Sequence, residues 1–192
     1  AFALQEAGFP YMTLKLLDET TANFTVTFAR TTQLQPFALP CIIGGTDSVN
    51  ALFENTVVDR VYAYDTEAEG VQLWMWGAVP SDEFNAFEDF TGYFVQLKEL
   101  AESDSTTLSV ECTVQSLSPP KRVPSLASPL ESATFPAGWN LISLPGVVPY
   151  PLGEFTTAED FRLFTCKQNY ECSELPATTP LTPGKPYWVL TE

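Results

Sequence analysis

Histidine is absent from the 192-residue chain, and this absence excludes more chemistry than any other feature of the composition. Ser-His-Asp and Cys-His hydrolysis, histidine-ligated zinc or haem, and imidazole proton transfer all require that side chain. Only carboxylate, lysine and tyrosine chemistry remains for catalysis. We therefore predict that the protein is not an enzyme.

Basic residues and long apolar runs are also scarce. Nine Lys and Arg stand against 24 Asp and Glu, which gives a net charge of −15. A surface of this sign repels phosphate backbones, so no nucleic-acid partner is expected. The longest apolar stretches, 37–43 and 71–79, are strand-sized, whereas a membrane span needs roughly 20 residues. We therefore predict no membrane insertion, and residues 1–10 are typical of a mature end from which a signal peptide has been removed.

The cysteines predict two disulfides. Their spacings, including the C-x5-C of CKQNYEC, fit no common zinc pattern, so no metal site is predicted. Three pairings are open, and we favour one local and one long-range bridge, which join Cys166 to Cys172 and Cys41 to Cys112. Disulfides indicate an oxidising, extracellular compartment, and the Asn-Phe-Thr sequon at Asn23 is a candidate glycosylation site there.

Three aromatic segments of the sequence are alike. PYMTLKL (10–16), GYFVQLK (92–98) and PYWVLTE (186–192) each open with Pro or Gly followed by Tyr, and then alternate as strands do. The first two continue through a polar turn into a second alternating strand, which predicts β-hairpins over 14–34 and 97–117. Strand formers recur throughout, so we predict an all-β fold of antiparallel sheets in sandwich-like modules with a few short helices.

A second pattern divides the chain into two related repeat units. QPFALPCIIGG (35–45) and GWNLISLPGVV (138–148) both place a short apolar strand before a Leu-Pro stop. Each is followed by an acidic amphipathic stretch, 48–55 or 156–164, for which we predict a short helix. A further short helix is predicted over 81–90, and further strands over 61–65 and 71–76.

These elements predict three segments of the chain. Residues 1–117 form an N-terminal β unit, made of a terminal segment, the hairpin 14–34, a module over 35–97 and the hairpin 97–117. Residues 118–137 form a proline-rich linker or strap, because proline cannot continue a central strand. Residues 138–192 form a C-terminal β module.

The terminal motifs of the second unit resemble a known kind of module. GWNLISLP (138–145) and GKPYWV (184–189) are similar to the first and last strands of β-rich modules in secreted bacterial and archaeal surface proteins, which carry a V-x-x-Y-D segment between them. A degenerate copy lies at 61–65 and 92–95 and lacks the Gly-Trp-Asn opening, while the second unit has a Cys loop in its middle. The resemblance implies an extracellular, repeated building module without catalytic residues.

The last strand, 187–192, has no following hairpin to pair with, and residues 1–17 are equivalent to the tail of a preceding repeat. An unpaired strand edge is a template for another chain. We therefore expect the N-terminal segment of one copy to complete the C-terminal module of the next, building an extracellular filament or surface layer. A monomer whose termini pair within one chain is an equally open alternative. The predicted assembly strands carry Phe2, Leu4, Met12, Leu14, Leu16, Tyr187, Trp188, Val189 and Leu190.

A secreted adhesin or carbohydrate-binding module is the alternative function, with glycan contact through exposed tryptophans. Trp139 and Trp188 lie in the repeat-defining strands, where we expect core packing, whereas Trp74 and Trp76 remain open.

Catalytic, cofactor and metal sites are not predicted. The acidic pairs 82–83, 88–89 and 159–160 are adjacent residues on amphipathic stretches, which a solvated face explains better than the two carboxylates of a glycosidase. Residues 44–47 with Asp59 have calcium-ligand chemistry, but Gly-Gly-Thr-Asp is more typical of a plain turn.

Overall fold

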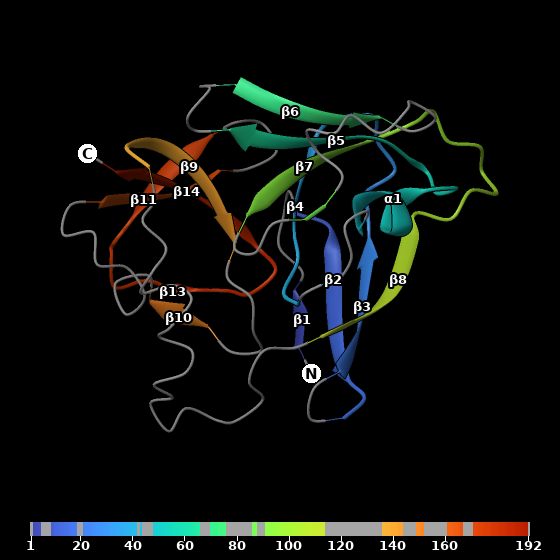
Figure 1. Cartoon of the computed structure of the whole chain (residues 1–192), viewed down its shortest axis with the longest axis horizontal. Coiled ribbons are helices and arrows are strands. Elements are labelled where there is room, and N and C mark those ends of the chain that lie inside the picture. The colour runs from blue at the N-terminus through green and yellow to red at the C-terminus, as the bar shows by residue number, and fades with distance from the viewer. Residues whose placement is uncertain are drawn as a thin grey trace.

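The structure is a computed structural model, and it confirms the all-β fold class (Figure 1). Its strands pair antiparallel throughout the described part of the chain, where α1 (Ser48–Phe53) is the one helix. The described residues are 2–4, 9–18, 21–41, 43, 48–65, 70–75, 86–87, 91–113, 136–143, 149–151, 161–166 and 171–191.

Sheet A contains β1 (Phe2–Leu4), β2 (Tyr11–Leu16), β3 (Thr21–Thr27) and β8 (Thr107–Thr113), in the order β1-β2-β3-β8. Strands β2 and β3 form the predicted first hairpin. The Asp18 carboxylate accepts the Thr21 N–H at 2.8 Å, and this bond closes the turn between them. Alternate residues of both strands are buried, so one face of sheet A points into a core.

Sheet B packs against that face. It contains β4 (Gln35–Ala38), β7 (Gly92–Leu97), β5 (Val58–Asp65) and β6 (Gly70–Met75), in the order β4-β7-β5-β6. The two sheets and α1 enclose one hydrophobic core, so this half of the protein is a β-sandwich. Phe37 lies at its centre, with its ring 5.7–6.3 Å from the rings of Phe24, Phe28, Phe53 and Phe87.

The predicted second hairpin, 97–117, is wrong. Strand β7 is flanked by β4 and β5 in sheet B, whereas β8 pairs with β3 in sheet A. The polar residues between them cross from one sheet to the other instead of turning back. Arg30 holds this crossing, because its guanidinium donates to the carbonyls of Ala101 at 2.6 Å and Asp104 at 2.8 Å.

Sheet C contains β9 (Gly138–Ser143), β14 (Pro186–Thr191), β11 (Phe161–Cys166) and β12 (Cys172–Leu175), in the order β12-β11-β14-β9. A two-stranded sheet of β10 (Tyr150–Pro151) and β13 (Pro180–Leu181) accompanies it. In Figure 1 sheet C, in orange and red, lies beside sheet B, and sheet A lies below sheet B.

The structure tests only part of the remaining element predictions. The helix expected over 156–164 is wrong where the structure describes it, because residues from Phe161 onward form β11, held between β12 and β14. The helix over 48–55 and the strands over 61–65 and 71–75 are present. The proline-rich segment lies almost entirely outside the described residues, as do most of 81–90 and residue 76.

Sheets B and C have the same strand order. In each, the first strand in the sequence pairs with the last, and the last pairs with the second. Their registers agree residue for residue. Gln35 faces Val95 as Asn140 faces Val189, and the next three pairs are equivalent as well: Pro36–Phe94, Phe37–Tyr93 and Ala38–Gly92 in sheet B, with Leu141–Trp188, Ile142–Tyr187 and Ser143–Pro186 in sheet C.

The equivalence extends to a buried amide. Gln35 is 1% exposed and holds the backbone of the preceding segment, accepting from the Ala29 N–H at 2.7 Å and donating to the Ala29 carbonyl at 2.9 Å. Asn140 is 6% exposed and donates to the Pro136 carbonyl at 3.0 Å. A buried amide at the same register position therefore anchors the entry to the first strand of each sheet.

The two sheets meet at Gly92, where a side chain has no room. A Cβ there would lie 2.8 Å from Cβ of Pro186 and 2.9 Å from Cγ of Leu141. The neighbouring Thr91 forms an isolated antiparallel bridge with Ile142. Glycine is therefore required at this position for sheet C to approach sheet B so closely.

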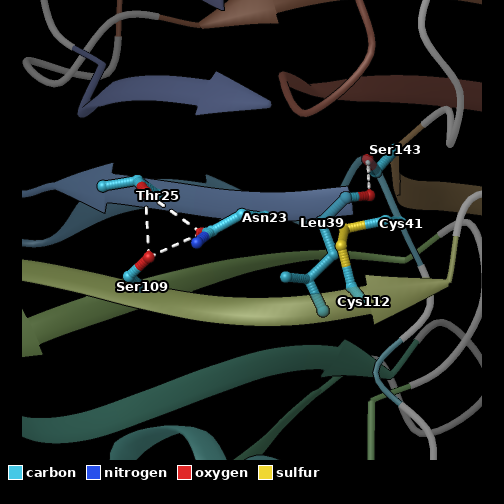
Figure 2. Close-up of a disulfide and its surroundings, with 7 residues drawn as sticks. All are labelled: Asn23, Thr25, Leu39, Cys41, Ser109, Cys112 and Ser143. Atoms are coloured by element: carbon cyan, nitrogen blue, oxygen red, sulfur yellow. Dashed lines mark hydrogen bonds between the residues drawn. A yellow bond between two sulfur atoms is a disulfide. The ribbon is translucent and has the colours of Figure 1, made fainter. Parts of the chain in front are cut away.

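Both favoured disulfides are present. Cys41–Cys112 closes 71 residues and joins the end of β4 to β8, and so links the two sheets of the sandwich (Figure 2). Cys166–Cys172 closes 6 residues and staples the β11–β12 hairpin. The described residues contain no free cysteine.

We predict unequal costs for removing these bridges. Loop-closure entropy gives about 4 kcal/mol for the 71-residue loop and about 2 kcal/mol for the 6-residue loop. The double variant Cys41→Ser/Cys112→Ser should therefore unfold at a lower denaturant midpoint than Cys166→Ser/Cys172→Ser. The reverse order of midpoints would contradict the sandwich-linking role of the long bridge.

We also predict that Gly92→Ala destabilises the junction between the sheets. The added methyl group meets Pro186 and Leu141 at distances that force a shift, and overpacking of this kind costs about 1–3 kcal/mol. Equilibrium denaturation measures the loss. Unchanged stability would show that sheets B and C do not approach each other as described.

Candidate functional site

The final strand, β14, was expected to lack a paired neighbouring strand and so to take part in assembly. This expectation is wrong. Strand β14 lies inside sheet C. It pairs with β11 from Phe161 opposite Thr191 to Phe164 opposite Trp188, and it pairs with β9 along its whole length. Its Tyr187 and Val189 side chains are buried, at 3% and 0% exposure. The sequence pattern did not reveal this because β9 and β11 come from earlier parts of the chain.

The N-terminal segment is also paired within its own chain. Strand β1 lies on β2, with Phe2 opposite Leu14 and Leu4 opposite Met12. Met12 and Leu14 are fully buried in the sandwich core, so their side chains serve the fold. The two termini are thus paired in different sheets, and they do not close one sheet together as the monomer alternative supposed.

Three of the sheet orders end in a short strand. These are β1, with 3 residues, in sheet A and β4 and β12, with 4 residues each, in sheets B and C. Cys166 and Cys172 have Cα atoms 4.0 Å apart, the short separation of a pair that is not hydrogen-bonded across the ladder. Because backbone direction alternates along a strand, the Glu174 N–H also points away from β11.

A strip of aromatic side chains crosses from sheet B to sheet C on the faces opposite their cores. Trp188 is its centre, with ring centroids 5.1 Å from Tyr64, 6.1 Å from Trp139 and 6.4 Å from Phe94. Phe164 continues the contact beyond Trp139, at 5.1 Å. These five residues, from strands β5, β7, β9, β11 and β14, are called the aromatic strip below.

Alternation along the strands puts the aromatic strip on this face. In β7 and β14 the side chains of Tyr93, Val95, Tyr187 and Val189 are buried, and the strip members Phe94 and Trp188 lie between them in sequence. Outward positions of a sheet are usually polar. Five rings on outward positions are therefore a feature that core packing does not require.

Trp139 and Trp188 were both expected to pack in a core. Trp139 does not, because it is 41% exposed, and Trp188 is half-buried. Both rings belong to the strip and lie perpendicular to each other, at an interplanar angle of 89°. The side chain of Trp74 and the whole of Trp76 lie outside the described residues.

A charged pair borders the strip on sheet C. Arg162 donates through Nε to Glu174 Oε1 at 2.9 Å and through Nη2 to Oε2 at 2.7 Å. The guanidinium also lies 5.1 Å from the centroid of Phe164. The hydrogen bonds from Arg162 lower the pKa of the Glu174 carboxyl below its ordinary value. Sequence reasoning missed this pair, although the alternation of Phe161, Arg162 and Leu163 signals an outward position for Arg162.

A smaller polar group borders the strip on sheet B. The Tyr62 hydroxyl donates to Gln96 Oε1 at 3.1 Å, and Gln96 donates in turn to the Thr32 carbonyl. Tyr62 and Gln96 share the outward face with Phe94, because Tyr62 is the register partner of Phe94.

The candidate glycosylation site lies on the opposite side of the sandwich. Asn23 is half-buried on the outer face of sheet A, where its Oδ1 accepts from Ser109 at 2.6 Å and from Thr25 at 3.4 Å (Figure 2). Thr25 and Ser109 are themselves bonded at 3.0 Å. A network of small polar side chains therefore surrounds the sequon.

No group of three or more potential metal ligands occurs among the residues the structure describes. Residues 44–47 lie outside them, and Asp59 pairs with Arg60 at 3.2 Å. No helix in the described ranges is long and apolar enough to cross a membrane.

Comparisons with protein-family models, curated proteins and solved structures find no match to this chain. Its likeness to surface-protein modules therefore rests on the terminal motifs themselves. Those motifs are β9 and β14, which lie side by side in sheet C.

The lowered pKa of Glu174 gives a direct prediction. Its carboxyl should titrate below the ordinary glutamate range by NMR, and Arg162→Gln should return it to that range. Because the folded-state pKa is lowered, the stabilisation is present above the unfolded-state pKa and is lost as the pH falls through the folded-state value. An unchanged Glu174 titration in Arg162→Gln would contradict the pairing.

Proposed function

We propose that this chain is a non-enzymatic structural subunit of an extracellular filament or surface layer, and that its partners are copies of itself. Subunits join by β-strand addition between the N-terminal segment of one copy and the C-terminal module of the next. The observation that carries the proposal is the position of β1 and β12 at the ends of two different sheet orders. The final strand, which is already paired on both sides, has no part in it.

The chemistry of the chain supports an extracellular location. Two disulfides are the mark of an oxidising compartment, and one of them links the two sheets of the sandwich. A net charge of −15 favours solubility at high local concentration. The Asn23 sequon is compatible with the same compartment.

The internal symmetry supports a building role. We infer that sheets B and C are two copies of one module, because they share strand order, register and a buried amide at the same position. Modules that stack side by side are typical of extended structural proteins. The Gly92 junction is one such stacking contact within a single chain.

The geometry of the two edges determines the kind of assembly. Because β1 and β12 are different strands in different sheets, their contact is heterologous, and a heterologous contact builds an open filament unless its rotation closes a ring. Main-chain hydrogen bonds between edges supply the affinity.

An adhesin or carbohydrate-binding module is the second candidate function. The observation that favours it is the exposure of Trp139 within the aromatic strip. A subunit of a surface layer can carry such a face as well, so the two functions are compatible.

The experiment removes one edge at a time. Deleting residues 1–10 removes the donor strand, and Glu174→Pro removes the outward N–H of β12 without removing a ladder bond of sheet C. Glu174→Ala is the matched control, because it also loses the Arg162 pair but keeps the N–H. Size-exclusion chromatography and electron microscopy should show filaments for the wild type and for Glu174→Ala, and monomers for the other two.

Mixing the two blocked variants tests the head-to-tail direction. Each retains the edge that the other lacks, so an equimolar mixture should yield dimers and no filament. Filaments of either variant alone, or a wild type that stays monomeric at all concentrations, would contradict the proposal.

A further inference from the structure

The aromatic strip has the chemistry of a binding surface. Rings of Trp139, Trp188 and Phe164 lie on outward positions of sheet C, and Trp139 keeps 41% of its surface exposed. Trp139 is exposed and the other four rings are half-buried, and a contiguous apolar patch marks an interaction site more clearly than scattered apolar residues do. The strip is contiguous, since each ring lies within 6.4 Å of another.

Polar groups border the strip where a ligand would need them. Arg162 and Glu174 lie on its sheet C side, with side chains 55% and 49% exposed, and Tyr62 and Gln96 lie on its sheet B side. Each Glu174 oxygen accepts one hydrogen bond from Arg162, and a carboxylate oxygen has two acceptor positions. The border therefore offers hydrogen bonds beside an apolar centre.

The charges near the strip and on the whole chain limit the class of ligand that the strip can bind. Arg162 and Glu174 neutralise each other, so the border selects neither an anion nor a cation. The chain carries a net charge of −15, which disfavours acidic polymers. A neutral ligand with flat apolar faces and a rim of hydroxyl groups matches both the rings and their borders.

Building on the second candidate function, we propose that the aromatic strip binds a neutral oligosaccharide, one of whose sugar faces stacks on the exposed ring of Trp139 while Glu174 accepts bonds from its hydroxyl groups. The five ring-bearing residues lie on neither β1 nor β12, whereas Glu174 lies on β12, so Trp139→Ala and not a Glu174 variant separates sugar binding from edge-to-edge assembly.

The test uses cellohexaose, chitohexaose and mannohexaose as probes, titrated against the full chain and followed by tryptophan fluorescence and calorimetry. At least one probe should bind, with an affinity that does not change with ionic strength. Trp139→Ala should weaken that binding tenfold or more, because the lost ring is a stacking surface. Glu174→Gln should weaken it less, since the amide retains an acceptor oxygen.

Tyr11→Ala is the matched control. Tyr11 is 43% exposed, close to the value for Trp139, but it lies on β2 in sheet A. It should bind the probe as the wild type does, and circular dichroism should show that both variants remain folded.

Three results would overturn the inference. The first is a wild type that binds none of the probes, and the second is an equal loss of affinity in Tyr11→Ala and Trp139→Ala. The third is self-association of the wild type that Trp139→Ala abolishes, which would assign the strip to a second copy of the chain.

Discussion

The close approach at Gly92 is the constraint on which the arrangement of sheets B and C depends. Sheet C reaches sheet B at a point where Pro186 and Leu141 occupy the space of a side chain. In the strand registers, Pro186 of β14 holds the position in sheet C that Gly92 of β7 holds in sheet B. The two residues that meet at this junction are therefore equivalent. The absence of a side chain at Gly92 leaves the space that Pro186 and Leu141 occupy where the two sheets meet.

The aromatic strip follows from that junction. Tyr64 and Phe94 belong to sheet B and Trp188 belongs to sheet C, so the rings can touch only if the two sheets are joined side by side. The sandwich core of sheets A and B does not depend on this junction. Its own aromatic cluster and the Cys41–Cys112 disulfide stabilise it. The aromatic cluster of the sandwich core and the aromatic strip are therefore separate sets of residues, on opposite faces of sheet B.

Local patterns in the sequence predicted local structure well. Alternation and turn residues identified the β2–β3 hairpin, α1 and most described strands, and cysteine spacing favoured the two bridges that are present. Pairing between distant strands was not predictable in the same way. Strands β7 and β8 follow each other in sequence like the arms of a hairpin, but the segment between them crosses to the other sheet. Arg30 donates hydrogen bonds to two backbone carbonyls of this segment.

The candidate site was predictable only in part for the same reason. Trp139 and Trp188 stood out in the sequence, but their exposure depends on which face of sheet C meets a core, and a strand read alone does not reveal which face that is. The contacts of Trp188 with Tyr64 join residues 124 positions apart in the chain. Such contacts come from the side-by-side packing of sheets B and C and not from any short motif.

The direct test of this account is the nuclear Overhauser effect between the ring protons of Tyr64 and the indole protons of Trp188 in the folded protein. Their centroids lie 5.1 Å apart, in an edge-to-face arrangement, so cross-peaks between the two rings are expected. A spectrum in which both rings are assigned and show only contacts within their own sheets would contradict the joined modules and the aromatic strip together.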